Sequence, residues 1–265
     1  LMNFEQLFTG FQSIRVAILG DVMLDTYWWG SVDRISPEAP VPVVALKNKE
    51  LRVGGAANVA LNTASLGAKT TMISIVGADA DGEQLVQLLK EKNIDTSYIR
   101  SVSNRVTTNK TRVMSRNQQM MRLDAEITTD IDEATENMLI EQVKHCLEEQ
   151  QPQVLIFEDY NKGVITERII QAVTALCKER NVIIAVDPKK KNFLSYKDVT
   201  IFKPNLKEVK EGLNLSVDHI DLSSLQQIHQ RLQEHLHHQI SLITLSEKGV
   251  FYQDETSHKI IPTHI

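Results

Sequence analysis

The sequence has few cysteines, no long apolar run and no signal peptide, and each absence removes a class of protein. Only two cysteines occur, Cys146 and Cys177, and both fall in helix-like patterns rather than at metal or redox spacings. We interpret them as reduced core thiols of a cytoplasmic protein. No apolar run approaches the length of a membrane span, and the N-terminus lacks the pattern of a secretion signal. We therefore expect no membrane partner.

Clustered basic residues and two common phosphate-binding motifs are also missing. The net charge of −5 arises from 29 basic and 34 acidic residues that are spread along the whole chain. Nucleic-acid binding needs a concentrated basic face, so we expect no nucleic-acid partner. The chain has neither a Gly-x-x-x-x-Gly-Lys-Ser/Thr loop nor a Gly-x-Gly-x-x-Gly fingerprint, and this absence removes the main support for P-loop and dinucleotide-binding readings.

Short apolar segments alternate with longer segments of helical period. We expect strands near 15–19, 70–76, 154–157, 182–186, 199–202, 240–245 and 249–253, and helices near 58–66, 81–93, 132–150, 165–180, 207–213 and 222–238. This order predicts an α/β fold with a mostly parallel central sheet that is covered by helices on both faces. Two polar-faced segments, within about 35–48 and 105–124, interrupt the alternation and are expected to pair as a small accessory sheet.

Chemically useful side chains follow several of the expected strands. In open α/β sheets ligands bind at the carboxyl ends of the strands, so these residues should meet at one edge. Any one of them could instead be a helix cap or part of a turn, but the repeated placement favours a small-molecule enzyme over a scaffold. The positions are Asp21, Asp25, Glu158, Asp159, Tyr160, Lys162, Asp187, Lys189, Lys203, Asn205, Ser246 and Glu247.

A glycine segment precedes the first long helical pattern. Gly54 and Gly55 permit a backbone turn that side chains would obstruct, and a helix then opens with Ala56 and Ala57. The N–H groups and positive dipole end of such a helix point at whatever occupies the cleft. Asn58 can both donate to and accept from hydroxyl groups. A plain strand-to-helix turn explains the same residues without a ligand.

With its downstream spacing, this segment resembles the first signature of the ribokinase-like, or phosphofructokinase B, carbohydrate kinases. The match runs through Gly54, Gly55, Asn58, Ala60, Gly67 and Gly77, and continues in 20–25, 187–188, 205–208 and 244–249, so it covers nearly the whole chain. A narrower resemblance, to the kinase domain of ADP-heptose synthases, is carried by 20–27, 34–43, 110–113, 115–119, 122–124 and 159–163. The resemblance implies a ribokinase-like three-layer fold with a small β lid, spanning residues 1–265.

The narrower resemblance implies a reaction and its partners. The reaction would be ATP-dependent phosphorylation of D-glycero-β-D-manno-heptose 7-phosphate at O1, with Mg²⁺, for ADP-heptose and the inner core of lipopolysaccharide. It also implies a homodimer formed through the lid strands and a full-length protein fused to an adenylyltransferase domain. Two alternatives stay open: another ribokinase-like sugar or nucleoside kinase, and a non-catalytic module that binds sugar phosphates.

The resemblance also implies roles for individual residues. Each role has a structural alternative. Asp25 could be a helix cap, the arginines could lie on a solvated strand, and Asn205 with Glu208 could be a plain helix start. Glu208 would reach the metal through water, and Lys189 the transferred phosphate. The sugar and its phosphate would be bound by Asp25, Gly54, Gly55, Asn58, Arg112, Arg116, Arg122 and Lys162, with Arg34 as a further candidate, and the nucleotide by Asp187, Lys189, Asn205, Glu208, Ser246 and Gly249.

The family's second signature, Asp-x-x-Gly-Ala-Gly-Asp, supplies the catalytic base and the anion hole, and it does not occur in this sequence. We expect the base beyond Ile265, the C-terminal part of the fold to be absent, and the 265-residue chain alone to be catalytically crippled. Four histidines, His229, His235, His237 and His238, could suggest a metal site, but a solvated helix end is the favoured interpretation.

Overall fold

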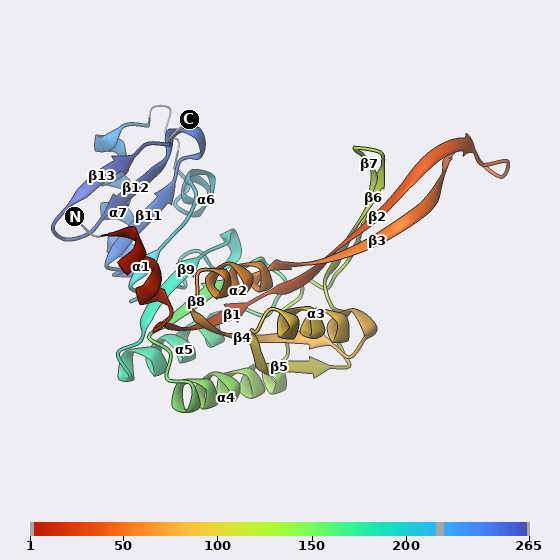
Figure 1. Ribbon diagram of the computed structural model, residues 1–265. Helices are drawn as coiled ribbons and strands as arrows, with labels where there is room; N and C mark the ends of the chain where they lie inside the picture. The colour runs from red at the N-terminus through yellow and green to blue at the C-terminus, as the bar shows by residue number, and fades with distance from the viewer. Residues whose placement is uncertain (1–2, 216–219, 264–265) are drawn as a thin grey trace.

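The structure, a computed structural model, describes residues 3–215 and 220–263 and is shown in Figure 1. Six of its α-helices begin at a side chain that accepts a hydrogen bond from the first turn, for example Asp79, Asp132 and Thr166. The helices are α1 (Phe4–Phe11), α2 (Ala56–Ser65), α3 (Ala80–Glu91), α4 (Glu133–Glu149), α5 (Glu167–Glu179), α6 (Leu206–Gly212) and α7 (Leu222–Leu236), with 3₁₀ turns η1 (Lys190–Asn192) and η2 (Ser246–Lys248). No helix of the described residues is long and apolar enough to cross a membrane.

A nine-stranded sheet forms the centre of the molecule, in the order β13-β12-β11-β10-β9-β8-β1-β4-β5. All neighbours from β11 to β5 run parallel, whereas β12 and β13 are antiparallel additions. This confirms the predicted α/β fold, although α1, β5 and β13 were not predicted. The strands are β1 (Arg15–Gly20), β4 (Lys69–Gly77), β5 (Asp95–Val102), β8 (Val154–Glu158), β9 (Ile183–Asp187), β10 (Ile201–Phe202), β11 (Ile240–Thr244), β12 (Val250–Gln253) and β13 (His258–Ile261).

Helices pack on both faces of this sheet, because its strands carry apolar side chains at successive positions. On one face Leu19 and Phe157 join the buried residues of α4, α5 and α7 in one cluster. On the other face Val16 and Ile18 pack with α2 and α3. The side chains of β9 and β10 on this second face are only partly buried, and Ile183 is 44% exposed. The cleft described below opens beside this partly exposed region.

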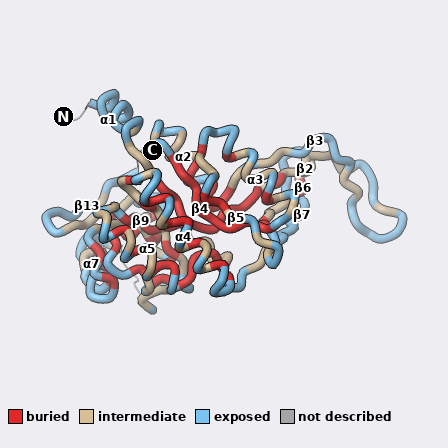
Figure 2. Tube along the Cα trace, turned by 90° about the horizontal axis from the view of Figure 1, so that it is seen from below, coloured by how far each residue is buried: buried red, intermediate tan, exposed pale blue. Residues whose placement is uncertain are grey.

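A second, four-stranded sheet forms the lid, in the order β3-β2-β6-β7. Figure 1 shows the long β2–β3 hairpin projecting away from the body, and Figure 2 shows that its outer part is exposed while the buried residues gather in the body. The lid had been expected within about 35–48 and 105–124, whereas this sheet also takes in the whole of 22–35. Its strands are β2 (Val22–Ile35), β3 (Pro42–Gly55), β6 (Asn109–Ser115) and β7 (Gln118–Ala125).

Two of the four histidines are not at a solvated helix end, which corrects that interpretation. His229 and His238 are buried, and both form a hydrogen bond with the buried Ser241 hydroxyl. The bond of His229 is through Nδ1 at 2.8 Å, and that of His238 is through Nε2 at 2.7 Å. Nδ1 of His238 has no partner among the described residues. Burial, reinforced by His229, lowers the pKa of His238 to about 4. Among the described residues no group of three or more acidic, histidine or cysteine side chains could hold a metal ion.

The buried imidazole of His238 predicts acid-sensitive folding. As the pH falls below the ordinary histidine pKa of 6.5, the unfolded chain binds a proton that the folded chain refuses until about pH 4, so stability is lost on acidification. Between pH 7.5 and 5 this should lower the free energy of unfolding of the wild type by about 2 kcal/mol relative to His238→Gln, measured by urea titration.

The comparison with the variant is needed because two buried carboxyl groups with raised pKa values, Glu158 and Asp21, act in the opposite sense. They favour folding as they take up protons, and their effect cancels between wild type and variant. The control is His235→Gln, on the exposed side of α7, which should leave the pH dependence unchanged. Identical pH profiles for wild type and His238→Gln would contradict the prediction.

Candidate active site

The candidate site lies at the carboxyl ends of the parallel strands. Gly20, Glu158 and Asp187 occupy equivalent register positions at the ends of β1, β8 and β9. Lys203 follows β10 directly, and its N–H donates to the carbonyl of Val186 over 2.8 Å. These positions therefore form a row on one face of the sheet, the face on which α2 packs.

Asp21 joins the end of β1 to the start of the lid. Its buried carboxylate accepts hydrogen bonds from the backbone N–H groups of Tyr160 at 2.8 Å, Lys162 at 3.1 Å and Val164 at 3.0 Å. Burial raises the pKa of Asp21 to about 6, although these hydrogen bonds oppose the shift. The 160–164 loop is thus held against the end of β1, which is a scaffold role that the sequence pattern did not distinguish from a ligand-binding one.

The glycine segment ends β3 and opens α2. Gly55 has φ +59°, and a Cβ atom there would lie 2.4 Å from the carbonyl oxygen of Asp21. A Cβ atom on Gly54 would lie 2.3 Å from Oδ2 of Asp25. In the described part of the chain α2 is the one α-helix without a side-chain cap at its start, and Asn58 is exposed in its first turn. The N-terminus of α2 therefore keeps backbone donors for another partner.

Asp25 and Arg112 form an ion pair on the lid. Oδ1 of Asp25 lies 2.5 Å from a guanidinium nitrogen of Arg112, and the two side chains are 20% and 23% exposed. The hydrogen bond that Arg112 donates to Asp25 is the main cause that raises the pKa of Arg112. Asp25 lies inside β2, so the interpretation of this residue as a helix cap is wrong. The pair places a carboxylate and a guanidinium side by side next to Gly54.

Two residues that the sequence analysis did not single out surround this pair. The ring of Tyr27 lies beneath the guanidinium groups of Arg52, at 4.8 Å, and Arg112, at 5.3 Å. Tyr27 lies two residues after Asp25 on the same face of β2. Arg52 is the register partner of Asp25 on β3. The sequence carried no clear signal for them, because 22–35 does not alternate regularly and Arg52 reaches the pair only through the pairing of β2 with β3.

The other predicted cationic residues are less closely grouped. Lys162 pairs with Glu126 at 2.7 Å, and the exposed Arg122 pairs with Asp124 at 2.9 Å. Arg116 lies in the turn between β6 and β7, is exposed and has φ +54°. It is four residues beyond Arg112, which along a strand is about 13 Å. The structure therefore places Arg116 at the tip of the hairpin, away from the Asp25–Arg112 pair.

A second group of charges lies at the ends of β8, β9 and β10. Lys203 pairs with Asp187 at 2.8 Å, and Lys189 pairs with Glu208 and lies 3.9 Å from Asp187. Although partial burial lowers it, the pKa of Lys189 is raised overall by Glu208 and Asp187. Burial and the nearby Asp187 raise the pKa of Glu158 to about 8. The ammonium groups of Lys189 and Lys203 are suited to neutralising the charge on the oxygens of a polyphosphate.

Asn205 and Glu208 form a capping box at the start of α6. The Asn205 side chain accepts from the N–H of Glu208, and Oε2 of Glu208 accepts from the N–H of Asn205, each over 2.8 Å. The other oxygen of Glu208 contacts Lys189. The helix-start interpretation is correct for the local geometry, yet it leaves one carboxylate oxygen directed at the charged group.

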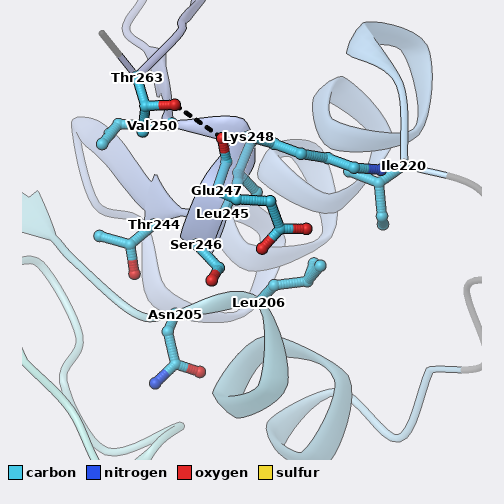
Figure 3. A pocket seen from close by; sticks show the side chains of 11 residues that line it. Asn205, Leu206, Ile220, Thr244, Leu245, Ser246, Glu247, Lys248, Val250 and Thr263 are labelled. Carbon is cyan, nitrogen blue, oxygen red and sulfur yellow. Dashed lines mark hydrogen bonds between the residues drawn. The ribbon is translucent and has the colours of Figure 1, made fainter. Parts of the chain in front are cut away.

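Ser246 and Gly249 line a cavity of about 590 Å³ beside α6. Figure 3 shows Ser246 and Glu247, from the turn after β11, on one side, with Asn205 and Leu206 on the other. Thr263 donates to the carbonyl of Glu247 over 2.7 Å and borders the same space. The cavity adjoins the predicted nucleotide residues Asn205 and Glu208, so the predicted nucleotide set is grouped in space.

The Asp159 carboxylate is hydrogen-bonded to residues that support the local structure. Its Oδ2 accepts from the Asn192 side chain at 3.0 Å and from the Tyr196 hydroxyl at 2.9 Å, and its Oδ1 accepts from the N–H of Asn161 at 2.8 Å. Asp159 therefore anchors Asn192, the last residue of η1, and Tyr196, which follows it along the chain.

Comparison with known proteins shows which family the chain is similar to. The model of the pfkB family carbohydrate kinases matches residues 13–264. The chain is 39% identical over 251 residues to the bifunctional protein HldE of Magnetococcus marinus, and 36% identical over 250 residues to that of Helicobacter pylori strain J99. Both alignments cover 94% of this chain but only 51% and 53% of the relatives, so the chain spans about half of their length.

Solved structures share the fold at lower identity. Phosphofructokinase-2 from Escherichia coli in complex with fructose-6-phosphate superposes with a TM-score of 0.72 at 20% identity, covering 94% of this chain and 80% of that one. Ribokinase from Arabidopsis thaliana complexed with ribose and ATP gives 0.67 at 17% identity, covering 95% and 78%. These structures show the fold that this chain shares with them. The chain belongs to the pfkB family of carbohydrate kinases.

The glycine turn gives a stability prediction. Gly55→Ala forces a side chain onto a positive φ and against the carbonyl of Asp21, so it should lower the free energy of unfolding by at least about 1–3 kcal/mol. The matched control is Gly10→Ala in α1, where a Cβ atom meets nothing within 4 Å. Helix propensity predicts that Gly10→Ala is neutral or mildly stabilising. Equal effects of the two substitutions in urea unfolding would count against the close approach.

Proposed function

We propose that the natural protein carrying this sequence phosphorylates D-glycero-β-D-manno-heptose 7-phosphate at O1, using ATP and Mg²⁺, in the cytoplasm. The product would enter ADP-heptose and lipopolysaccharide inner-core synthesis. The proposal is supported by the similarity to two HldE proteins and by the sequence runs that resemble ADP-heptose synthase kinase domains. The word "bifunctional" in the relatives' names, together with the half-length match, supports a second, adenylyltransferase domain in the natural protein.

The observation that carries the proposal is the Asp25–Arg112 pair beside the glycine turn. A sugar phosphate requires an acceptor for its hydroxyl groups and a cation for its phosphate, and the pair supplies both within one contact. Asp25, Gly54, Gly55 and Asn58 would hold the hydroxyl groups. Arg112 would meet the 7-phosphate through its planar fork, with Lys162, Arg122 and Arg116 as further cationic candidates on the lid side.

Phosphoryl transfer depends mainly on positioning and on charge neutralisation. Lys189 would meet the transferred phosphate, and Asp187 would help to position it. Glu208, fixed by its capping box with Asn205, would reach Mg²⁺ through water, while Ser246 and Gly249 would border the adenine and ribose. Held there, Mg²⁺ would supply positive charge that offsets the charge of the phosphates. We assign the general base to the Asp of the family's second signature, which does not occur in residues 1–265.

The test is a coupled ADP-release assay on the natural protein with a panel of sugars. Heptose 7-phosphate should give the highest kcat/KM. Turnover of fructose 6-phosphate or of a nucleoside, but not of heptose 7-phosphate, would identify another kinase of the family. Calorimetry that detects sugar phosphate binding but no ATP binding would favour the non-catalytic module.

Within this assay Arg112→Ala should lower kcat/KM for the sugar phosphate by about 10–100-fold, the loss expected for a charged hydrogen bond. The KM for ATP should stay within about twofold, because the phosphate-side lysines are untouched. Arg112→Lys should be intermediate, since it keeps the charge and loses the fork. Arg168→Ala is the matched control, since it removes an ion pair with Glu136 between α4 and α5 and Arg168 is 46% exposed. An equal rise in both KM values would contradict the assignment.

We also propose a homodimer formed through the lid. One face of the lid carries Asp25, Tyr27 and Arg112, whereas the register places Trp28, Val113, Met121 and Leu123 on the other. Met121 is 55% and Leu123 47% exposed. An apolar strand face beside a charged one favours pairing with the same face of a second copy.

Leu123→Lys should convert the dimer to a monomer in size-exclusion chromatography with light scattering, because it places a charge in the proposed apolar contact. Leu66→Lys is the matched control, since Leu66 is equally exposed at 47% but follows α2 in the body. A dimer that persists in Leu123→Lys, or that dissociates equally in both variants, would contradict an interface formed by the lid.

A further inference from the structure

Arg105 is a partly buried cation that the proposed function does not use, in the connection between β5 and β6. Its guanidinium group donates hydrogen bonds to three backbone carbonyl groups, those of Thr129 at 3.0 Å, Ile127 at 3.2 Å and Lys162. Burial lowers the pKa of Arg105, because a buried cation is stable only when its donors are satisfied. A planar group with five N–H donors can span carbonyl groups of two separate segments, which a compact ammonium group cannot.

The backbone beside Arg105 is fixed to the body. The N–H of Thr107 donates to Oδ2 of Asp79 over 2.8 Å, and the Thr107 hydroxyl accepts from the N–H of Gly77 over 2.9 Å. Thr107 is 2% exposed, and Gly77 is the last residue of β4. Two residues after Thr107 the chain enters β6. Arg105 therefore extends from a fixed base at the point where the chain leaves the body for the lid.

The chain returns from the lid through residues 126–131, which pack against the loop that contains Gly163. A Cβ atom on Gly163 would lie 2.0 Å from the carbonyl oxygen of Thr129, and Gly163 has φ +82°. The N–H of Ile131 donates to the carbonyl of Gly163 over 3.0 Å. Because Arg105 binds carbonyl groups of both segments, its side chain joins the start of the β6–β7 hairpin, the end of that hairpin and the loop after β8.

Lys162 is held at each of its polar groups. Its N–H donates to Asp21 over 3.1 Å, its carbonyl accepts from Arg105, and its ammonium group pairs with Glu126 over 2.7 Å. Glu126 directly precedes Ile127, whose carbonyl also accepts from Arg105. One guanidinium group therefore fixes the backbone next to both partners of the Lys162–Glu126 pair.

We propose that Arg105 is a positioning residue, which clamps the return from the lid to the loop after β8 and so fixes the place of the Lys162 ammonium group. The Lys162 and Glu126 side chains are only 16% and 24% exposed, so their pair depends on the backbone on both sides. A displacement of about 1 Å at a substrate-positioning group can cost a reaction on the order of 100-fold. The clamp rests on these contacts alone. That the positioned ammonium group meets a sugar phosphate rests on the proposed function.

The first measurement is hydrogen exchange of the backbone amides in the natural protein, without sugar or ATP. In Arg105→Gln the amides of Ile131 and Lys162 should exchange at least about tenfold faster than in wild type, because their hydrogen bonds lie in the clamped segments. Amides of α5 should be unchanged, which separates loss of the clamp from general destabilisation. Arg100→Gln is the matched control, since Arg100 also donates to a backbone carbonyl, that of Ser97, but lies within β5.

The second measurement is the kinetic split in the ADP-release assay. Arg105→Gln should lower kcat/KM for the sugar phosphate about tenfold, while the KM for ATP stays within about twofold. Arg105→Lys keeps the charge but not the planar group, so it should give a smaller loss of the same kind. In a Lys162→Met background Arg105→Gln should have little further effect, because the clamp acts through Lys162.

Equal exchange at Ile131 and Lys162 in wild type and Arg105→Gln would overturn the proposal. Full rescue by Arg105→Lys would do the same, because it would assign the effect to charge alone. So would an undiminished effect of Arg105→Gln in the Lys162→Met background. The exchange measurement contains no substrate, so it decides on the clamp even where the heptose assay fails.

Discussion

The carboxylate of Asp21 is the contact on which both halves of the cleft depend. The carboxylate accepts three hydrogen bonds from backbone N–H groups of the 160–164 loop. The backbone N–H of Asp21 donates to the carbonyl of Glu158, and the backbone carbonyl of Asp21 accepts from the N–H of Ala56. One buried residue therefore fastens the end of β1, the start of the lid, the first turn of α2 and the loop after β8. Satisfying so many groups offsets the cost of burying its charge.

This junction explains how the proposed ligand-binding residues of the lid can be held in place although much of the lid is exposed. The chain passes from the main sheet to the lid at Asp21 and returns to the body at Gly55, and these two positions are in contact through the Ala56 N–H. Asp25 lies four residues after Asp21, and Arg112 is the register partner of Tyr27, six residues after Asp21. They are therefore positioned by the rigid body, whereas Arg116 at the hairpin tip is not.

The sequence was sufficient for the parts of the fold that depend on local patterns. Apolar runs and helical periods identified the parallel strands and most helices, and the rule for strand ends grouped Asp187, Lys189 and Asn205 correctly in space. It could not reveal β2, because 22–35 mixes charged and aromatic residues and pairs with strands about 20 and 85 residues away. The hydrogen bond between His229 and Ser241 was hidden for a related reason, because β11 brings Ser241 back to α7 from twelve residues further along the chain.

The capping box shows why local and functional interpretations of a motif need not exclude each other. Glu208 has two carboxylate oxygens: one satisfies the N–H of Asn205, and the other contacts Lys189. The helix start fixes the side chain in place, and that rigidity lets the second oxygen act at the cleft without further ordering cost. Glu158 is the contrasting case in the same row. Its Oε2 atom has no hydrogen-bond partner among the described residues, so burial, together with the nearby Asp187, raises its pKa to about 8 and favours the neutral carboxyl group instead of a charged pair.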